Sequence, residues 1–170
     1  MMPTATLDTN VLEEYWREQE KAAVTESLLA LAVRGRVDLA ITSRISEDIP
    51  NLPLAKRIND LPESGIRQIG SVLRFDISTF DGGDMFGSDL FLEVSSALDD
   101  KFNRQGRRKK RPDWRDWDHL HGHFLTGRDV FLTWDGAILE MASELQEKLG
   151  IVVKTPQEFL CSQTGLTRDA

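Results

Sequence analysis

The chain has one cysteine, one tyrosine and no long hydrophobic run among its 170 residues. Cys161 alone cannot form an internal disulfide, and a single thiol cannot supply a cysteine metal cluster. No apolar stretch approaches the roughly 20 residues that a membrane helix needs. The opening segment MMPTATLD has no basic stretch followed by an apolar one, so we expect no secretory signal. We therefore expect a cytoplasmic protein without a membrane partner.

Positive charge is also scarce, because 21 Lys and Arg stand against 28 Asp and Glu, a net charge of −7. The positive charges are unevenly distributed along the chain. Residues 101–115 hold eight Lys and Arg against one Asp, so this basic segment carries +7 and the other 155 residues carry −14. A short basic segment on an acidic body suits a protein that binds cations in one place and phosphates in another. For the run RRKKR, a solvated loop is the alternative interpretation.

Short apolar runs alternate with helical patterns along the chain. The length fits one domain with a sizeable core, spanning residues 1–170. Strands are predicted at 4–8, 37–42, 71–78, 130–133 and 151–154, and helices at 21–33, 90–102, 116–126 and 137–149. This alternation predicts a three-layer α/β fold, with a mainly parallel central sheet flanked by helices.

Acidic residues stand at or near the ends of three predicted strands and at the start of a later helix. They are Asp8, Glu47, Asp48, Asp116, Asp118 and Asp135. The carboxyl ends of parallel strands meet at one edge of a sheet, where open α/β sheets bind ligands. Crowded carboxylates repel each other unless a cation neutralises them, and oxygen ligands suit Mg²⁺ or Mn²⁺. The pattern predicts a metal site at this edge, although each acid taken alone is typical of a solvated surface.

The segments LDTNVL, LAITSRISEDI and FLTWD, with a helix-opening acid between the last two, resemble the PIN-domain nucleases, which include the VapC toxins. The resemblance implies a metal-dependent ribonuclease whose ion is held by Asp8, Asp118 and Asp135. Asp116 is an alternative to Asp118, because either separation from Asp135 suits the family pattern. The second acid is open between Glu47, the type more frequent in the family, and Asp48, which precedes an apolar residue. Asn10 and Thr133 would orient the ligands or the phosphate.

The resemblance covers residues 4–50 and 114–160, so the region 51–113 is predicted to be an insertion or a divergent helical region. From its charge, we also expect the segment 104–117 to bind the RNA backbone, through Arg104, Arg107, Arg108, Lys109, Lys110 and Arg111. The chain has no helix-turn-helix of its own, so the implied antitoxin would be a separate protein. A homodimer is compatible with the same resemblance.

Three histidines and two tryptophans lie near Asp118. His119 and His123 have a spacing that two Zn²⁺ ligands can use, but no cysteine or further histidine completes such a site. We therefore expect helix-surface histidines, with His121 as the candidate for contact with phosphate or with Asp118. Trp114 and Trp117 lie beside arginines, a mixture that can stack unpaired bases or pack the helix onto the domain.

Two other functions are open. A non-catalytic PIN-like module would bind RNA or protein without cleaving it. A haloacid-dehalogenase-type phosphatase is favoured only by the partial match of LDTNV to its DxDx[TV] signature, in which Asn10 replaces the second aspartate.

Overall fold

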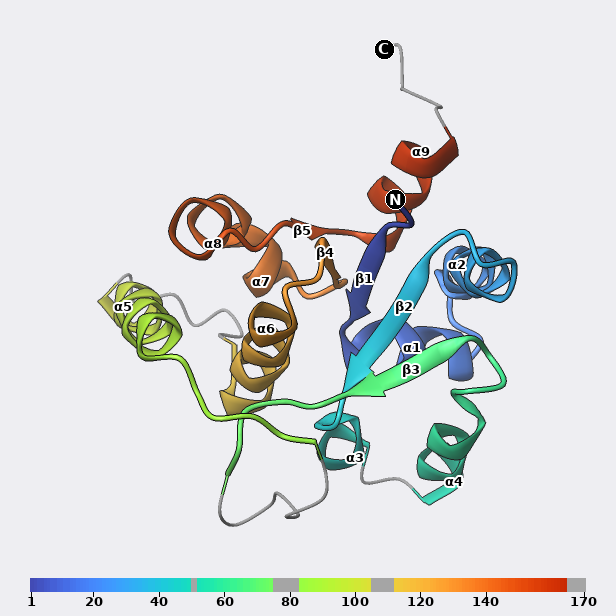
Figure 1. Ribbon diagram of the computed structural model, residues 1–170, viewed down its shortest axis with the longest axis horizontal. Helices are drawn as coiled ribbons and strands as arrows, with labels where there is room; N and C mark the ends of the chain where they lie inside the picture. Colours follow the sequence, from blue (N-terminus) through green and yellow to red (C-terminus); the bar gives the residue numbers. More distant parts are fainter. Residues whose placement is uncertain (50–51, 75–82, 105–111, 165–170) are drawn as a thin grey trace.

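A parallel β-sheet forms the centre of the molecule (Figure 1). The computed structural model describes residues 1–49, 52–74, 83–104 and 112–164. The strands are β1 (Thr4–Leu7), β2 (Asp38–Thr42), β3 (Ile66–Ile69), β4 (Val130–Leu132) and β5 (Val153–Lys154). They pair in the order β3-β2-β1-β4-β5, and every pair is parallel. The predicted α/β class is confirmed.

Helices cover both faces of the sheet (Figure 1). One layer contains α1 (Thr9–Trp16), α2 (Ala22–Val33) and α9 (Pro156–Thr164). The other contains α5 (Asp89–Arg104), α6 (Trp114–Thr126), α7 (Gly136–Glu140) and α8 (Ala142–Leu149). Between β2 and β3 lie α3 (Ile45–Asp48), α4 (Leu52–Ala55) and the 3₁₀ helix η1 (Lys56–Asp60). Within the ranges given above, no helix is long and apolar enough to cross a membrane.

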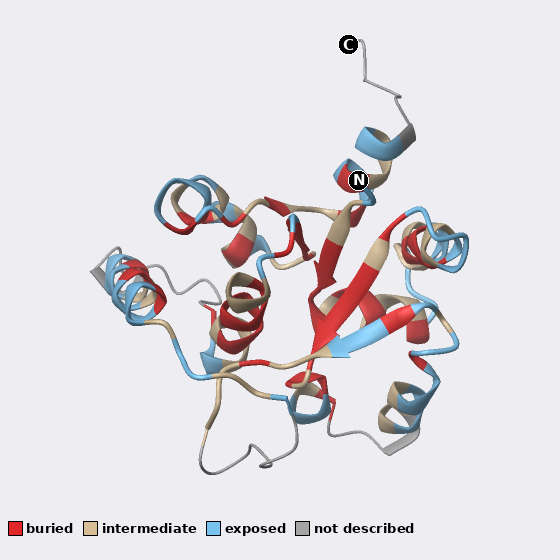
Figure 2. Ribbon diagram, viewed as in Figure 1, coloured by how far each residue is buried: buried red, intermediate tan, exposed pale blue. Residues whose placement is uncertain are grey.

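The central strands are buried on both faces, which explains their nearly continuous apolar sequences (Figure 2). Successive strand residues point to opposite faces. Leu7, Ile41 and Leu132 therefore pack in the core beneath α1 and α2, while Phe131 packs in the core beneath α6 and α8. The sheet is thus held between two separate cores.

The structure differs from the sequence prediction in the region 51–113. The sequence predicts a strand at 71–78, but the strand of this region is β3, and Val72 forms only an isolated bridge with Met85. Residues 75–78 lie outside the described part of the chain. Because β3 is an edge strand, its middle residues Arg67 and Gln68 are exposed, and the apolar alternation that marks a strand is missing. This region contributes a strand to the central sheet.

Two helices also begin or end at other residues than the sequence predicts. The helix α6 begins at Trp114 rather than at residue 116, because Asp113 caps it through a reciprocal pair of hydrogen bonds with Asp116. The helix predicted at 137–149 is divided at Met141 into α7 and α8.

The segment after β3 passes very close to the backbone near Gly83. A Cβ atom added at Gly70 would lie 1.9 Å from the Gly83 carbonyl oxygen. Gly70→Ala should therefore force the backbone to shift and lower the free energy of unfolding by about 1–3 kcal/mol, measured by urea denaturation. The matched control is Gly136→Ala, because a Cβ there meets no atom within 4 Å. Equal stabilities of the two variants would contradict this close approach.

Candidate functional site

The candidate site lies where β1 and β4 end side by side at the centre of the sheet (Figure 1). From β1 the chain continues into α1 on one face, and from β4 it continues into α7 on the other. Strand order therefore reverses between β1 and β4. Such a switch point opens a crevice beyond the carboxyl ends of the strands, where α/β proteins bind ligands.

Asp8 lies at this switch point, directly after β1, and is only 3% exposed. Its Oδ2 accepts hydrogen bonds from Thr133 Oγ1 at 2.6 Å and from Asn10 Nδ2 at 2.7 Å. The Asn10 Oδ1 accepts a bond from the Trp134 backbone N–H at 3.1 Å. The backbone N–H of Asp135 donates to Thr133 Oγ1 at 2.9 Å. The loops after β1 and β4 are thus tied together around the Asp8 carboxylate.

Asp135 and Asp116 stand at the beginnings of the helices α7 and α6. The Asp135 Oδ1 caps α7 by accepting bonds from Ala137 N at 2.7 Å and Ile138 N at 3.4 Å. The Asp116 Oδ2 accepts a bond from Asp113 N at 2.7 Å in the capping box of α6. Both carboxylates also benefit from the positive end of a helix dipole.

These acids interact electrostatically with Asp8. Burial raises the pKa of Asp8, and the negative charges of Asp48 and Asp135 raise it further. Burial raises the pKa of Asp116 to about 7, with further contributions from the charges of Asp8, Asp113 and Asp135. We call Asp8, Asp48, Asp116 and Asp135 the acidic cluster. The charges of Asp48 and Asp135 thus act on Asp8, and those of Asp8 and Asp135 act on Asp116, as expected where carboxylates share a cation site.

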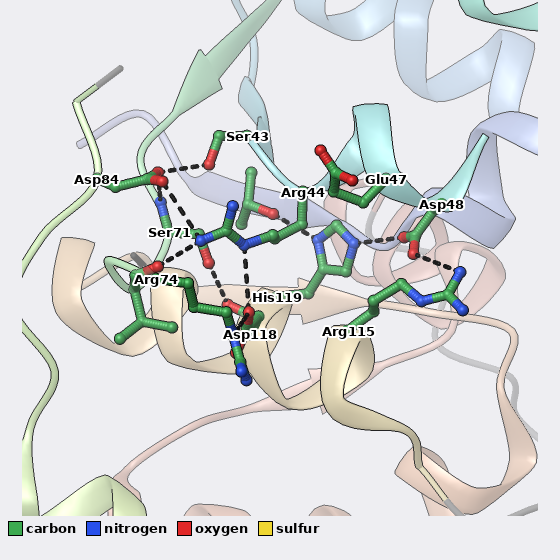
Figure 3. Close-up of polar contacts among 12 residues, drawn as sticks. Ser43, Arg44, Glu47, Asp48, Ser71, Arg74, Asp84, Arg115, Asp118 and His119 are labelled. Atoms are coloured by element: carbon green, nitrogen blue, oxygen red, sulfur yellow. Dashed lines mark hydrogen bonds and ion pairs between the residues drawn. The ribbon is translucent and has the colours of Figure 1, made fainter. Parts of the chain in front are cut away.

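Of the two candidates for the second acid, Asp48 points toward His119 and Arg115 (Figure 3), whereas Glu47 is exposed. The Asp48 Oδ2 accepts a hydrogen bond from Thr9 Oγ1 at 2.7 Å and lies 2.6 Å from His119 Nε2. Arg115 Nη1 lies 3.7 Å from the other carboxylate oxygen. Although burial opposes ionisation, these partners lower the pKa of Asp48.

His119 is a part of this site that the sequence did not identify. The sequence predicts it on the helix surface, but it is fully buried, with Nδ1 2.5 Å from Thr42 Oγ1 and Nε2 bonded to Asp48. Burial lowers the pKa of His119, but the hydrogen bond and the charge of Asp48 raise it above its usual value. His119 and Asp48 therefore form a buried ion pair. Its position on α6, three residues after Asp116, is the sequence signal that could have indicated it.

The structure does not bring Asp118 to Asp8 and Asp135. Its Oδ2 accepts bonds from Arg44 Nε at 3.1 Å and Arg74 Nε at 2.6 Å, and its Oδ1 accepts one from Arg74 Nη2 at 2.9 Å (Figure 3). Successive helix residues turn by about 100°, so the side chains of residues 116 and 118 point in roughly opposite directions. Of the two alternatives that the sequence analysis gave for the third acid, Asp116 is therefore the one that interacts with Asp8 and Asp135.

The other predicted site residues have separate surroundings. His121 Nε2 accepts a bond from Ser88 N at 2.9 Å, and its ring stacks on Phe91 with centroids 4.1 Å apart. The buried His123 bonds through Nδ1 to Thr6 Oγ1 at 2.9 Å. Arg104 is the last residue of α5, and residues 107–111 lie outside the described ranges. In the part of the chain that the structure describes, no three His, Cys, Asp or Glu side chains are arranged, as they stand, to hold a metal ion.

Comparison with known proteins gives similarities in structure but none in sequence. No family model and no curated protein matches the chain. The structure is similar to a chain of VapBC2 from Rickettsia felis bound to a DNA fragment from their promoter, with 10% identity, a TM-score of 0.48, and coverage of 89% of this chain and 98% of that one. It is also similar to a chain of FitAcB from Neisseria gonorrhoeae, with 14% identity, a TM-score of 0.48, and coverage of 90% and 98%. At these values neither structure assigns the chain to a family.

Asp116 and Asp118, two residues apart on one helix, should have opposite effects on stability. Because the folded pKa of Asp116, about 7, lies above the ordinary value of 3.8, the folded protein loses stability as the pH rises from 3.8 to 7. Asp116→Asn removes this loss, so its stabilising effect should grow over that range and level off above it, at about 1–2 kcal/mol after allowance for solvent screening. Urea denaturation in chelator between pH 4 and 8 measures it.

Asp118→Asn should instead destabilise by about 2–4 kcal/mol, because the buried Arg44 and the adjoining Arg74 lose a charged partner. Both variants conserve side-chain size, so each is the control for the other. Effects of the same sign at pH 8 would contradict the assignment of the two carboxylates to different surroundings.

Proposed function

We propose that this protein is a metal-dependent ribonuclease of the PIN-domain type, which hydrolyses phosphodiester bonds of RNA. The observation that carries the proposal is the buried carboxylate of Asp8 at the switch point of the sheet, with Asp116 and Asp135 in its electrostatic field. Its hydrogen bonds come from a hydroxyl and an amide, which do not neutralise its charge. Open α/β sheets bind their ligands at this place.

The donor chemistry of the cluster fits Mg²⁺ or Mn²⁺. Asp8, Asp116 and Asp135 offer carboxylate oxygens, the ligands that these hard cations prefer. The raised pKa values of Asp8 and Asp116 fit a cation as well, since a positive ion would relieve the cost of ionising both. Such an ion, when bound, would position a phosphate and lower the pKa of a water molecule. In this proposal Asn10 and Thr133 hold Asp8 in place.

Asp48 has a different task from the other three acids. It is already neutralised by His119 and bonded to Thr9, so we assign it to holding the buried imidazole beneath the site. The exposed Glu47 takes no part. His119 then contributes one positive charge that limits the repulsion among Asp8, Asp48 and Asp116.

The basic segment is the proposed contact for the RNA backbone. Its last residue, Arg115, lies at the start of α6 and reaches Asp48 of the acidic cluster. The chain therefore leads directly from the run of Lys and Arg to the site where a phosphodiester would be cleaved. Neutralising phosphates releases counterions, which supports affinity without reading sequence.

The resemblance to VapC toxins adds a separate antitoxin partner and a homodimer to the proposal. Action in the cytoplasm is proposed from the sequence itself, whose single cysteine cannot form an internal disulfide.

A non-catalytic RNA-binding or protein-binding module is the second candidate. It is favoured by the absence, among the described residues, of three side chains already arranged around an ion position. A haloacid-dehalogenase-type phosphatase has less support, because the amide of Asn10 donates to Asp8 at the position where that signature places a second carboxylate.

The proposed reaction should require a divalent ion and the Asp8 carboxylate. Single-stranded RNA should be cleaved with Mg²⁺ or Mn²⁺ and remain intact in chelator. Asp8→Asn should lower the cleavage rate at least about 100-fold, because the ion loses a charged ligand while the neutral amide leaves the fold intact. Electrophoresis of end-labelled RNA measures the rate, and circular dichroism checks the fold.

Asp100→Asn is the matched control, since Asp100 is an exposed carboxylate on α5. Cleavage by Asp8→Asn at the wild-type rate would overturn the role of Asp8. Wild-type protein that binds RNA but never cleaves it, with either ion, would favour the binding module.

The basic segment should affect binding more than chemistry. Replacing Arg107, Arg108, Lys109 and Lys110 by Ser should weaken RNA affinity and reduce the slope of log K against log salt by up to about 3, at about 0.7 for each phosphate that is no longer neutralised. Titration of labelled RNA at several salt concentrations measures this slope. If the variant had the affinity and the salt slope of the wild-type protein, the run RRKKR would not contact RNA, and its interpretation as a solvated loop would hold.

A further inference from the structure

A lysine from the start of α2 lies over the ring of Trp134, in the loop that follows β4. The Lys21 Nζ is 4.5 Å from the centre of this ring. The Trp134 backbone N–H donates to Asn10 Oδ1 at 3.1 Å, and the amide of Asn10 donates to Asp8. The residue after Trp134 is Asp135 of the acidic cluster, and its own ring packs against the core beneath α1 and α2. A positive charge is therefore held beside the acidic cluster, on the side of α1 and α2.

The position of Lys21 follows from the turn that joins α1 to α2. The backbone N–H of Gln19 donates to the Glu14 carbonyl at 3.0 Å, which ends α1 in a closed turn. The Thr25 hydroxyl donates to the Val11 carbonyl at 3.2 Å and ties the first turn of α2 to the first turn of α1. Because α1 begins at the carboxyl end of β1, the start of α2 lies at the same edge of the sheet as the candidate site.

Neither helix stability nor an ion pair accounts for a lysine at this position. Lys21 is the N-cap of α2, at the positive end of the helix dipole, where a cation is unfavourable. In the part of the chain that the structure describes, it forms no ion pair with a carboxylate, although Glu18 and Glu20 are its exposed neighbours in sequence. An aromatic ring attracts a cation but leaves its charge unneutralised. The charge of the half-buried Lys21 is therefore available to an anion.

We propose that Lys21 binds a phosphate group of the RNA strand next to the bond that is cleaved, and that Trp134 holds the ammonium in place for this contact. The choice of RNA as the ligand rests on the proposed function. The acidic cluster repels a phosphodiester, so a strand that crosses it is stabilised by positive groups on both sides. Arg115 of α6 stands on one side, where it reaches Asp48, and Lys21 stands on the other, because α6 and α2 cover opposite faces of the sheet (Figure 1).

RNA binding at several salt concentrations tests the proposal. Fluorescence anisotropy of a labelled oligonucleotide of ten uridines is measured in chelator on an Asp8→Asn background, so that no cleavage interferes. Lys21→Gln should reduce the slope of log K against log salt by about 0.7, the value for one phosphate of a single strand, and should weaken binding roughly fivefold at about 0.1 M salt. Lys21→Arg should preserve both quantities, because a guanidinium also binds phosphate and an aromatic face.

Lys148→Gln is the matched control. It removes an exposed lysine near the end of α8, just before β5 begins, so at the opposite edge of the sheet. It should leave the salt slope and the affinity unchanged. A folded Lys21→Gln variant with the affinity and the salt slope of its parent would overturn the proposal, and so would equal losses in the Lys21→Gln and Lys148→Gln variants.

Trp134 supplies a second readout, through its coupling to Lys21. Trp134→Leu keeps an apolar side chain against the core but removes the ring, so it should weaken RNA binding roughly threefold. In the Lys21→Gln variant the same change should have little further effect, because the ammonium that the ring holds is already gone. Additive losses would contradict the role of Trp134. Wild-type protein that shows this dependence on Lys21 but does not cleave RNA with Mg²⁺ or Mn²⁺ would support the phosphate contact and contradict the proposed function, so the two failures are distinguishable.

Discussion

The neutralisation of buried carboxylates around α6 is the constraint on which the rest of the structure depends. Asp118 is neutralised by Arg44 and Arg74, and Asp48 by His119. Within the described part of the chain, Asp8, the most central acid, accepts side-chain hydrogen bonds from a hydroxyl and an amide. An ionised carboxylate is costly to bury without a positive partner, and the raised pKa of Asp8 expresses this cost. The electrostatic potential at the switch point of the sheet is therefore negative, and a negative potential would attract a cation.

The residue at which α6 begins determines that Asp116 lies near Asp8 and that Asp118 lies near the arginines. Asp113 and Asp116 fix the first turn through their capping box, and Gly127 ends the helix in the left-handed region at φ 57°. With the helix so fixed, Asp116 faces Asp8 while Asp118 faces the arginines. Asp116 therefore serves both the folding of the helix and the charge of the site, although burial raises its own pKa.

The sequence was informative wherever the local pattern determines the structure. The apolar runs of β1, β2 and β4 are buried on both faces and were recognisable, and Asp8 and Asp135 follow directly from where these strands end. The edge strand β3 has no such pattern. The choice between Asp116 and Asp118 depends on helix phase, and the helix begins two residues earlier than its apolar pattern indicates. The spacing of three residues from Asp116 indicates the face of α6 on which His119 lies. Its burial and its ion pair depend on Thr42 and Asp48, which are distant in sequence, so the spacing alone does not establish them.

The ion network of Asp118 also connects the two sides of α6. Arg44 follows β2 and bonds to the Val72 carbonyl, Asp84 accepts from Ser43 and from the Ser71 backbone, and the Ser71 hydroxyl donates to the Asp118 carbonyl (Figure 3). Buried ion networks add little stability over apolar packing, but they allow few alternative arrangements. This network therefore fixes where the segment after β3, with Arg74, lies against α6. The contacts that keep Asp118 away from Asp8 also hold Val72 and Arg74 against α6. These residues and Asp118 line a cavity of about 550 Å³ on that face of the helix.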